Sequence, residues 1–345
     1  MNDRHSPHRW LPPEWAAQQF VVLTWPHDRS DWGDDLEAAD STFRSMAHAI
    51  ASEERLVIAC RDQAHREHVA ALLGQLSAAT FCIAPSNDIW VRDHGPITVI
   101  RDGRLELLDF RFNGWGNRYP ADLDNRVTAT LVEAGAFADF IHTPVDAVLE
   151  GGSVETDGEG TVLLTSRCLL HPSRNGAVDR DWVEARMQEW FGCAHVLWLD
   201  HGRLEGDDTD GHVDMLARFA PGRRILYTAC DDPADSHHEE LAAMAAQLRE
   251  FRNRDGDPYT PVALPWPPAL HDSDGKRLPL SYANFLVING AVLVPVYGVD
   301  TDRDALTRIA EAFPGRQTIP INALPLVRQH GGVHCATMQV PFAAR

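Results

Sequence analysis

The chain has 345 residues, of which 44% are hydrophobic, so it can bury a large core as one domain or two. Its 31 Lys and Arg residues against 50 Asp and Glu residues give a formal net charge of −19. This balance argues against a nucleic-acid backbone or an anionic membrane as the main partner. It suits a cationic ligand, or simply solubility.

The six cysteines are widely spaced and include no Cys-x-x-Cys pair, which is typical of a reduced chain rather than of a disulfide framework or a zinc site. The segment from Met1 to Pro13 is polar and lacks the apolar stretch of a signal peptide. No segment approaches the roughly 18 apolar residues of a membrane span. We therefore expect a cytoplasmic protein. The cysteines are Cys60, Cys82, Cys168, Cys193, Cys230 and Cys335.

Short apolar runs predict strands, and patterns with helical periodicity lie between several of them, which indicates a mixed α/β chain. The expected elements, in chain order, are strand Phe20–Thr24, helix Asp35–Ser52, strand Leu56–Cys60, helix Gln63–Leu76, strand Leu105–Phe110, strand Val162–Thr165, helix Val178–Trp190, strand Val196–Leu199, strand Ile225–Thr228, helix His238–Phe251, strands Phe285–Ile288 and Ala291–Val296, and helix Arg303–Phe313. The segment Asn253–Pro279 is rich in proline and aspartate, so we expect a long surface loop or lid there.

A weak internal repeat accompanies these elements. Four turn sequences between apolar runs predict β-hairpins, and polar clusters precede them. Repeated units that open with polar residues favour a ring whose polar ends meet at one centre, although the unequal spacing also fits chance. The turns are Asp102-Gly103, Asp157-Gly158, Pro221-Gly222 and Asn289-Gly290; the clusters are Asp88–Asp93, Glu150–Ser153, Asp207–Asp214, Ser281–Asn284 and, near the C-terminus, Gly331–Cys335.

Cys335 is the first candidate for chemistry. It follows two glycines and sits beside His334, in a polar sequence where the backbone can bend sharply and a ligand can approach closely. A nucleophilic cysteine needs its thiolate form, so positive charge must lie nearby, and a cationic substrate can supply it. A buried structural cysteine is the alternative.

His212 and Asp214 are the second candidates. Two residues that are two apart share one face of a strand, so this pair can combine a proton carrier with a carboxylate that binds a cation. A metal site is a competing interpretation, because histidine and carboxylates are common ligands. A solvated acidic loop is the third.

Two further clusters could bind a planar cation. Trp90 could stack on a guanidinium group while Asp93 accepts paired hydrogen bonds from it. The alternative is a turn in which Arg92 forms a structural ion pair. Glu150 precedes two glycines and could orient a histidine or a bound cation, although for this segment alone a plain turn is the favoured interpretation.

Taken together, these motifs resemble the agmatine deiminases, which belong with the bacterial-type peptidylarginine deiminases in the guanidine-modifying superfamily. The resemblance covers nearly the whole chain and rests on motifs in the family's order. They are Leu11-Pro-Pro-Glu14-Trp15, Thr24-Trp25-Pro26, Asn87-Asp88-x-Trp90-x-Arg-Asp93-x-Gly-Pro96, Phe112-Asn-x-Trp115-Gly116, Glu150-Gly-Gly, Asp208-Thr-x-Gly-His212-Val-Asp214, Ser281-Tyr-x-Asn284-Phe and Gly331-Gly-x-His334-Cys335.

The resemblance implies a fold: one catalytic domain spanning residues 1–345, built as a pentein, a five-bladed pseudo-symmetric α/β propeller of ββαβ-type repeats. It also implies a hydrolase that converts agmatine to N-carbamoylputrescine and ammonia on the route to putrescine, with no cofactor or metal. The expected partner is a small cationic guanidino substrate, and homo-oligomerisation stays open.

The resemblance also implies roles for individual residues. Cys335 attacks the guanidinium carbon and forms a covalent amidino-thioether, while His212 protonates the departing ammonia and then activates water. Asp93 and Asp214 hold the guanidinium nitrogens, and Glu150 orients the cation and His212. The remaining contacts to the substrate are expected from Trp90, Trp115, Asp88 and Asp208.

Three alternatives remain at the level of the sequence. A deiminase of free or peptidyl arginine needs a basic residue to receive the substrate carboxylate, and Arg111 and Arg118 are the nearby candidates. An amidinotransferase would use an amine in place of water. A guanidinium- or polyamine-binding protein would bind agmatine without releasing ammonia.

Overall fold

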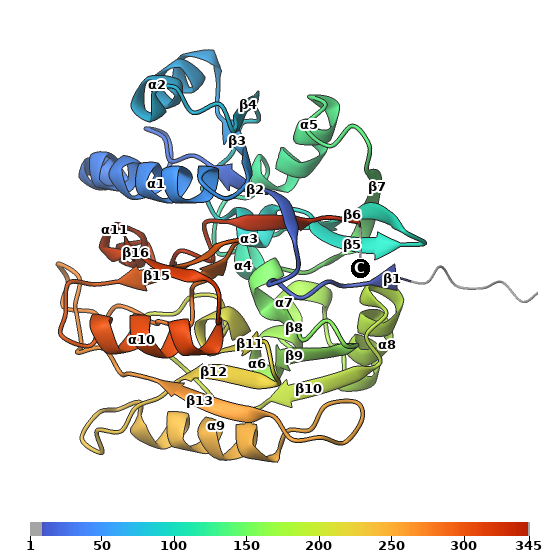
Figure 1. The fold of residues 1–345 in the computed structure, drawn as a ribbon, viewed down its shortest axis with the longest axis vertical. Helices are drawn as coiled ribbons and strands as arrows, with labels where there is room; N and C mark the ends of the chain where they lie inside the picture. The colour runs from blue at the N-terminus through green and yellow to red at the C-terminus, as the bar shows by residue number, and fades with distance from the viewer. Residues whose placement is uncertain (1–8, 344–345) are drawn as a thin grey trace, which may run out of the picture.

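The structure is a computed structural model that describes residues 9–343, so the polar N-terminal sequence up to residue 8 lies outside the described residues. Five small sheets surround a common centre, and the longer helices cover their outer faces (Figure 1). The predicted five-bladed propeller is therefore confirmed. The six longer helices are α1 (Leu36–Ala51), α2 (Gln63–Leu73), α5 (Val127–Glu133), α8 (Arg180–Phe191), α9 (His238–Glu250) and α10 (Asp302–Ala312).

Each sheet repeats one pattern: an antiparallel pair of strands followed by a third strand parallel to the second strand of that pair. The helix between the second and third strands makes the parallel connection possible. The strands, in sheet order, are β1 (Arg9–Trp10), β5 (Ile97–Arg101), β6 (Arg104–Arg111) and β7 (Ile141–Val148); β8 (Val154–Thr156), β9 (Thr161–Thr165) and β10 (His195–Leu199); β11 (Ala217–Ala220), β12 (Arg224–Thr228) and β13 (Thr260–Leu264); β14 (Leu286–Val287), β15 (Ala291–Val296) and β16 (Gln317–Asn322); and β17 (Met338–Pro341), β2 (Gln18–Thr24), β3 (Arg55–Cys60) and β4 (Ala79–Ile83).

The fifth sheet closes the ring with both ends of the chain. Strand β17 pairs antiparallel with β2, so Met338 lies opposite Val22 and Val340 opposite Phe20. Residues more than 300 positions apart in sequence thus complete one blade. The four hairpins predicted from turn sequences are confirmed as β5–β6, β8–β9, β11–β12 and β14–β15.

The segment Asn253–Pro279 differs from the expectation of a loop or lid. It contains β13, which pairs in parallel with β12, and its residues do not line the pocket that holds Cys335. The strand is hidden in the sequence because it carries Pro261. Proline is tolerated at a sheet edge, where β13 lies.

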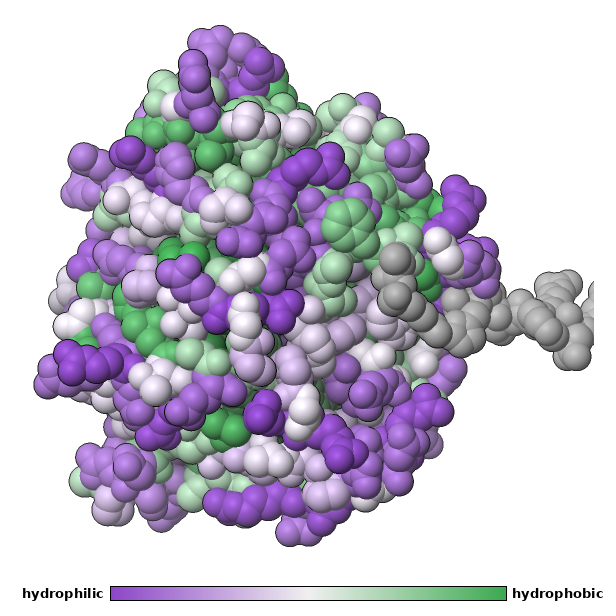
Figure 2. Space-filling model, in the orientation of Figure 1, coloured by the Kyte–Doolittle hydropathy of each residue, from purple (hydrophilic) through white to green (hydrophobic). Residues whose placement is uncertain are grey.

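Buried apolar residues from all five blades fill the space between sheets and helices. In the space-filling view of Figure 2, hydrophilic residues cover most of the visible face, and apolar residues lie in separate groups among them. No helix within residues 9–343 has the length and apolarity needed to cross a bilayer.

Candidate active site

Short polar segments immediately before the first strand of each sheet's antiparallel pair supply the central residues. They are α3 (Val91–His94) before β5, the 3-10 turns η3 (Gly151–Ser153) before β8 and η4 (Val213–Met215) before β11, the turn at Asn284 before β14, and the turn at Cys335 before β17. The polar clusters therefore meet at the centre of the ring, as the sequence predicted. One detail of the expectation was wrong, because His212 and Asp214 lie at the start of η4 rather than on a strand.

Gly152 marks the point where three of these segments meet. A Cβ atom at this position would lie 2.7 Å from His212 Nδ1, 2.9 Å from Asp93 Oδ1 and 3.0 Å from Asp214 Oδ2. Those distances leave no room for any side chain. The glycine therefore allows a histidine and two carboxylates to approach one another across three blades.

Asp93 is fully engaged in this cluster. Its Oδ1 accepts a hydrogen bond from the backbone N–H of Gly152 (3.0 Å), and its Oδ2 accepts one from Trp115 Nε1 (2.9 Å). Burial raises the pKa of Asp93 to about 6; the charge of Asp214 also raises it, while His212 and Trp115 act in the opposite direction. Around neutral pH this carboxylate is mostly ionised and can bind a cation.

His212 is buried between two carboxylates. Its Nδ1 lies 3.6 Å from Asp93 Oδ1 and its Nε2 lies 3.6 Å from Glu150 Oε2. Neither ring nitrogen has a hydrogen-bond partner within residues 9–343. Burial alone would lower the pKa of His212, but Asp93, Cys168 and Glu150 together raise it well above its ordinary value. The imidazole is thus cationic and can donate a proton.

Two neighbours of Glu150 were not found from the sequence. Arg174 Nε donates to Glu150 Oε1 (3.1 Å), and the Cys168 thiol lies 3.9 Å from Glu150 Oε2. Burial raises the pKa of Glu150, but His212 and Arg174 outweigh it and leave that pKa below its ordinary value. No motif marks Arg174 or Cys168, because both belong to the short helices α6 (Ser166–Leu169) and α7 (Pro172–Asn175) outside the polar clusters.

Glu150, Cys168 and His212 could together hold a metal ion, because one donor atom of each lies within 4.8 Å of the others. However, the charge of Glu150 is already offset, because Arg174 forms an ion pair with it. A divalent ion would have to compete with that arginine and with the charge of His212.

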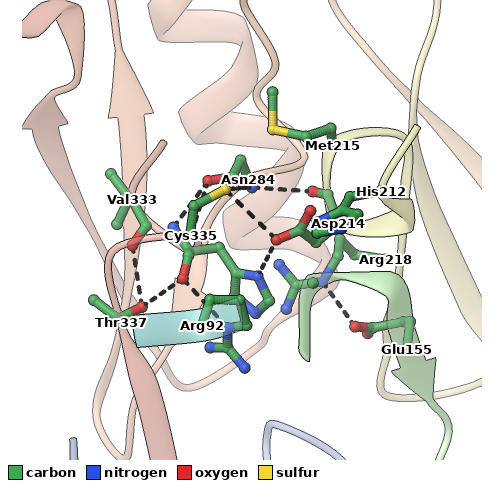
Figure 3. Close-up of polar contacts among 12 residues, drawn as sticks. Arg92, Glu155, His212, Asp214, Met215, Arg218, Asn284, Val333, Cys335 and Thr337 are labelled. Atoms are coloured by element: carbon green, nitrogen blue, oxygen red, sulfur yellow. Dashed lines mark hydrogen bonds and ion pairs between the residues drawn. The ribbon is translucent and has the colours of Figure 1, made fainter. Parts of the chain in front are cut away.

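Cys335 lies at the floor of the pocket. Its sulfur receives a hydrogen bond from Asn284 Nδ2 (3.2 Å) and lies 3.8 Å from Asp214 Oδ2, as Figure 3 shows. Burial raises the pKa of the Cys335 thiol well above its usual value, and the charges of Asp214 and Asp93 add to the effect. A cation bound between these carboxylates would reverse the two electrostatic contributions and favour the thiolate.

The two glycines before Cys335 allow close packing rather than an unusual backbone angle. A Cβ at Gly331 would lie 2.2 Å from Trp90 Cζ3, and one at Gly332 would lie 2.3 Å from Asn284 Oδ1. The turn is thereby pressed against the indole on one side and the amide on the other. The same amide oxygen accepts a hydrogen bond from the backbone N–H of His334 (2.9 Å), which fixes the residue next to the cysteine.

The pocket above Cys335 is acidic and aromatic. Trp90 Nε1 donates to Asp88 Oδ2 (3.0 Å), and Tyr119 Oη donates to Asp208 Oδ2 (2.8 Å). Burial raises the pKa of Asp88 to about 6 and also raises the pKa of Asp208. The pocket is lined by Asp31, Asp88, Trp90, Asp93, Trp115, Tyr119, Asp208, Thr209, Met215, Gln329, His330, Gly331 and Cys335.

The nine residues singled out from the sequence therefore share one region of the fold. Six of them line the pocket, while Glu150, His212 and Asp214 lie directly behind its floor. The fold thus brings together motifs that lie between residues 88 and 335 of the sequence.

The two arginines considered for a substrate carboxylate are committed elsewhere. Arg111 pairs with Asp146 (3.2 Å) at an exposed position and is not part of the pocket lining. Arg118 contacts the backbone carbonyl of Asp208 and pairs with Asp210. No lysine or arginine stands among the described residues that line the pocket.

Comparison with known proteins adds to this geometry. An agmatine deiminase of Stutzerimonas stutzeri is 32% identical over 96% of this chain and 95% of its own length. A solved structure from Porphyromonas gingivalis, provisionally described as an arginine deiminase, is 47% identical with a TM-score of 0.91 and covers 97% of this chain and 99% of its own. An agmatine deiminase of C. jejuni, solved as a Cys-to-Ser variant with its substrate bound, is 32% identical with a TM-score of 0.89 and covers 97% of this chain and 96% of its own. The model of the Porphyromonas-type peptidyl-arginine deiminases matches residues 10–341, so the chain belongs to this family.

Proposed function

We propose that the protein hydrolyses agmatine to N-carbamoylputrescine and ammonia, with Cys335 as the nucleophile. The observation that carries the choice of substrate is the charge of the pocket, which combines four aspartates with no lysine or arginine among its described lining residues. A dication fits this setting, whereas the carboxylate of arginine would meet like charge without a basic partner.

In the proposed complex, the guanidinium group lies between Asp93 and Asp214, above the sulfur of Cys335. Asp214 Oδ1 is buried and without a hydrogen-bond partner in the described part of the chain, so it is available to a guanidinium N–H. Trp90 and Trp115 bound the carbon chain of the substrate. The amine at its far end approaches Asp88 and Asp208.

The bound cation offsets the charges of Asp93 and Asp214, so the Cys335 thiol releases its proton to water. The thiolate attacks the guanidinium carbon and forms a C–S bond. His212 donates a proton to one terminal nitrogen, and the bond between that nitrogen and carbon breaks to release ammonia. The amidino group remains attached to Cys335 as a thioether.

His212, now neutral, takes a proton from a water molecule that attacks the same carbon. The C–S bond then breaks, which restores the thiolate, and the hydroxyl proton of the product passes to solvent as N-carbamoylputrescine is released. His212 keeps the proton that it took from water. In sum, one agmatine cation and one water give one carbamoyl product, one ammonia and one proton, which together leave as ammonium. The carboxylates stay ionised throughout and stabilise the positive charge of the reacting group.

A second candidate is hydrolysis of arginine, which the printed description of the 47% identical Porphyromonas gingivalis structure favours. Arg118 would then have to leave Asp210 to receive the substrate carboxylate. An amidinotransferase and a binding protein without turnover are separated from both by whether ammonia is released. Because all six cysteines are free and buried, we also propose a reducing, cytoplasmic location.

The test is a set of parallel initial-rate measurements of ammonia release with agmatine, arginine, arginyl peptides and guanidino acids. We expect kcat/KM for agmatine to exceed that for arginine by about 30- to 1,000-fold, which corresponds to placing an unpaired carboxylate beside an aspartate. Cys335→Ala serves as the control for turnover by this site. Equal or better kcat/KM for arginine would reject agmatine as the substrate, and ammonia release by the folded Cys335→Ala variant would reject the site.

A further inference from the structure

A buried group of charged residues joins the N-terminal segment to Asp214 on the side away from the pocket. None of its members is more than 6% exposed. It contains three acids and three bases, so its charges balance when every member is ionised. The members are Glu14, Glu155, Asp214, Arg92, Arg218 and His334. Figure 3 shows that Asp214, Arg218 and Glu155 follow one another away from Cys335.

His334 is the link between the two ends of this group. Its Nδ1 lies 2.7 Å from Asp214 Oδ2, and its Nε2 lies 2.7 Å from Glu14 Oε2. Carboxylate oxygens only accept hydrogen bonds when ionised, so both ring nitrogens must carry a proton. A neutral imidazole has only one N–H and would leave one of these two short contacts without a donor.

Further hydrogen bonds hold the Glu14 carboxylate in place. Its Oε2 also accepts from Arg218 Nη2 (2.7 Å), and its Oε1 accepts from the backbone N–H of Val287 (2.7 Å). Burial alone would raise the pKa of Glu14, but the charges of Arg218 and His334 bring it well below its usual range. The carboxylate is therefore a fixed anion at the far end of His334.

The contact with His334 leaves the two oxygens of Asp214 in different states. Its Oδ2 is occupied by His334, while its Oδ1 is buried without a partner in the part of the chain that the structure describes. Burial acts to raise the pKa of Asp214, and the hydrogen bond and charge of His334 overcome this and lower it. One oxygen is thus anchored and the other remains open.

We propose that Glu14 and His334 are positioning residues, which keep Asp214 ionised and turned so that one of its oxygens is reserved for the guanidinium group. The inference rests on the proposed function for the identity of the cation. It assigns a task in the centre of the propeller to a residue of the N-terminal segment, which lies 200 positions before Asp214 in the sequence.

Several other charged or titratable groups face His334, Glu14 and Asp214. His334 faces Glu14 and Asp214 with its ring, and its backbone carbonyl accepts from Arg92 Nε (3.3 Å). Glu155 lies on Arg218 and makes no hydrogen bond to His334. Asp214 further faces His212 and the thiol of Cys335. Removing the charge of Glu14 therefore leaves His334 with Asp214 as its one hydrogen-bonded anion.

The variant Glu14→Gln tests the proposal, because it keeps the size of the side chain and removes its charge. With agmatine we expect KM to rise about 10- to 100-fold with a smaller change in kcat, since the loss falls on the binding of the cation.

Glu155→Gln is the matched control. It removes a buried carboxylate from the same Arg218, so it carries the general cost of disturbing the charged group. We expect its KM to match that of the wild type. A folded Glu14→Gln variant with wild-type KM, or an equal rise of KM in both variants, would overturn the proposal.

A measurement on the unaltered protein covers the case in which Glu14→Gln does not fold. Nitrogen-15 NMR of histidine-labelled wild type should show both ring nitrogens of His334 protonated at pH 7.5, with the signal assigned by comparison with His334→Gln and with His212→Asn. A neutral His334 ring would overturn the proposal without any activity assay. If the wild type releases no ammonia from agmatine, the proposed function fails, while this NMR result still decides the protonation on which the positioning role depends.

Discussion

Two opposing requirements meet at the side chain of Asp93. It is buried beside Asp214, which favours its neutral form, yet the proposed chemistry needs its charge. Two hydrogen bonds, from Gly152 and Trp115, stabilise the carboxylate. The resulting pKa of about 6 leaves the residue charged near neutrality but sensitive to mild acid.

The pH dependence of activity follows from this value. Below about pH 6 Asp93 is protonated and cannot bind the guanidinium cation, so kcat/KM should fall as the pH falls through that value. Trp115→Phe removes one hydrogen bond to the carboxylate and should move the acidic limb to higher pH. Initial rates measured after dilution into buffers from about pH 4.5 to about pH 9 give the position of this acidic limb.

Trp182→Phe is a suitable control, because this indole is exposed on α8. Its profile should coincide with that of the wild type. A limb in Trp115→Phe at or below the wild-type position would show that Asp93 does not govern acid inactivation.

Residue-level roles could be predicted only where a motif carried them. Cys335, His212 and the carboxylates lie in recognisable polar clusters, so their types and order suggested their chemistry. Arg174, Cys168 and the pairing of His334 with Glu14 had no such signal. His334 and Glu14 lie 320 positions apart, and the closed propeller brings them within range. Arg174 and Cys168 lie closer to Glu150 in sequence, but on short helices that carry no motif.

At the scale of the element, the site is built by the turns that enter the hairpins. η3 brings Gly152 to the point where Asp93, His212 and Asp214 meet, and the turn before β17 places Cys335 next to Asn284. Turns that lead directly into a strand keep side chains in fixed positions, which favours preorganised electrostatics.

Gly152→Ala tests how much depends on that close approach. The added methyl group would lie within 3.0 Å of three polar atoms, so either the turn or the carboxylates must shift. A displacement of about 1 Å in a catalytic group is enough to reduce kcat/KM about 100-fold. Steady-state kinetics with agmatine measures the change, alongside thermal unfolding of the same sample.

Gly290→Ala is its matched control, since a Cβ there meets only the end of the exposed Glu53 side chain, which can move away. This variant should keep wild-type kinetics. Wild-type activity in Gly152→Ala would mean that the three polar groups need not be so close for catalysis.

Most elements could be predicted from apolar periodicity, but three edge strands that contain proline could not. The strands β7, β13 and β16 end their sheets and contain Pro144, Pro261 and Pro320, respectively. An edge strand has one unpaired side, so it tolerates proline and needs less alternation of apolar residues. Its identity depends on the neighbour it pairs with, which local sequence does not specify.

At the scale of the whole molecule, closure of the ring depends on both chain ends. Because β17 completes the sheet of β2 and β3, no blade of the propeller is independent of its neighbours. We propose that the chain is a single catalytic domain. Calorimetry should then show one unfolding transition whose calorimetric and van't Hoff enthalpies agree.

Removal of residues 338–345 should abolish that cooperative transition, because β2 would lose its antiparallel partner and the propeller would stay open. Two resolved transitions in the intact protein would instead indicate separate folding units. Retention of the wild-type transition by the truncated chain would show that β17 is dispensable.

During turnover of agmatine, we expect Cys335 to carry the amidino group. Intact-mass measurement after rapid acid quench, followed by peptide mapping, tests it most directly, and a slow His212 variant is additional material for accumulating the adduct. We predict an added mass equal to agmatine less ammonia, located on Cys335. An adduct on Cys168 or another cysteine, or turnover of agmatine without any covalent adduct on a rapid-quench time course, would contradict the account.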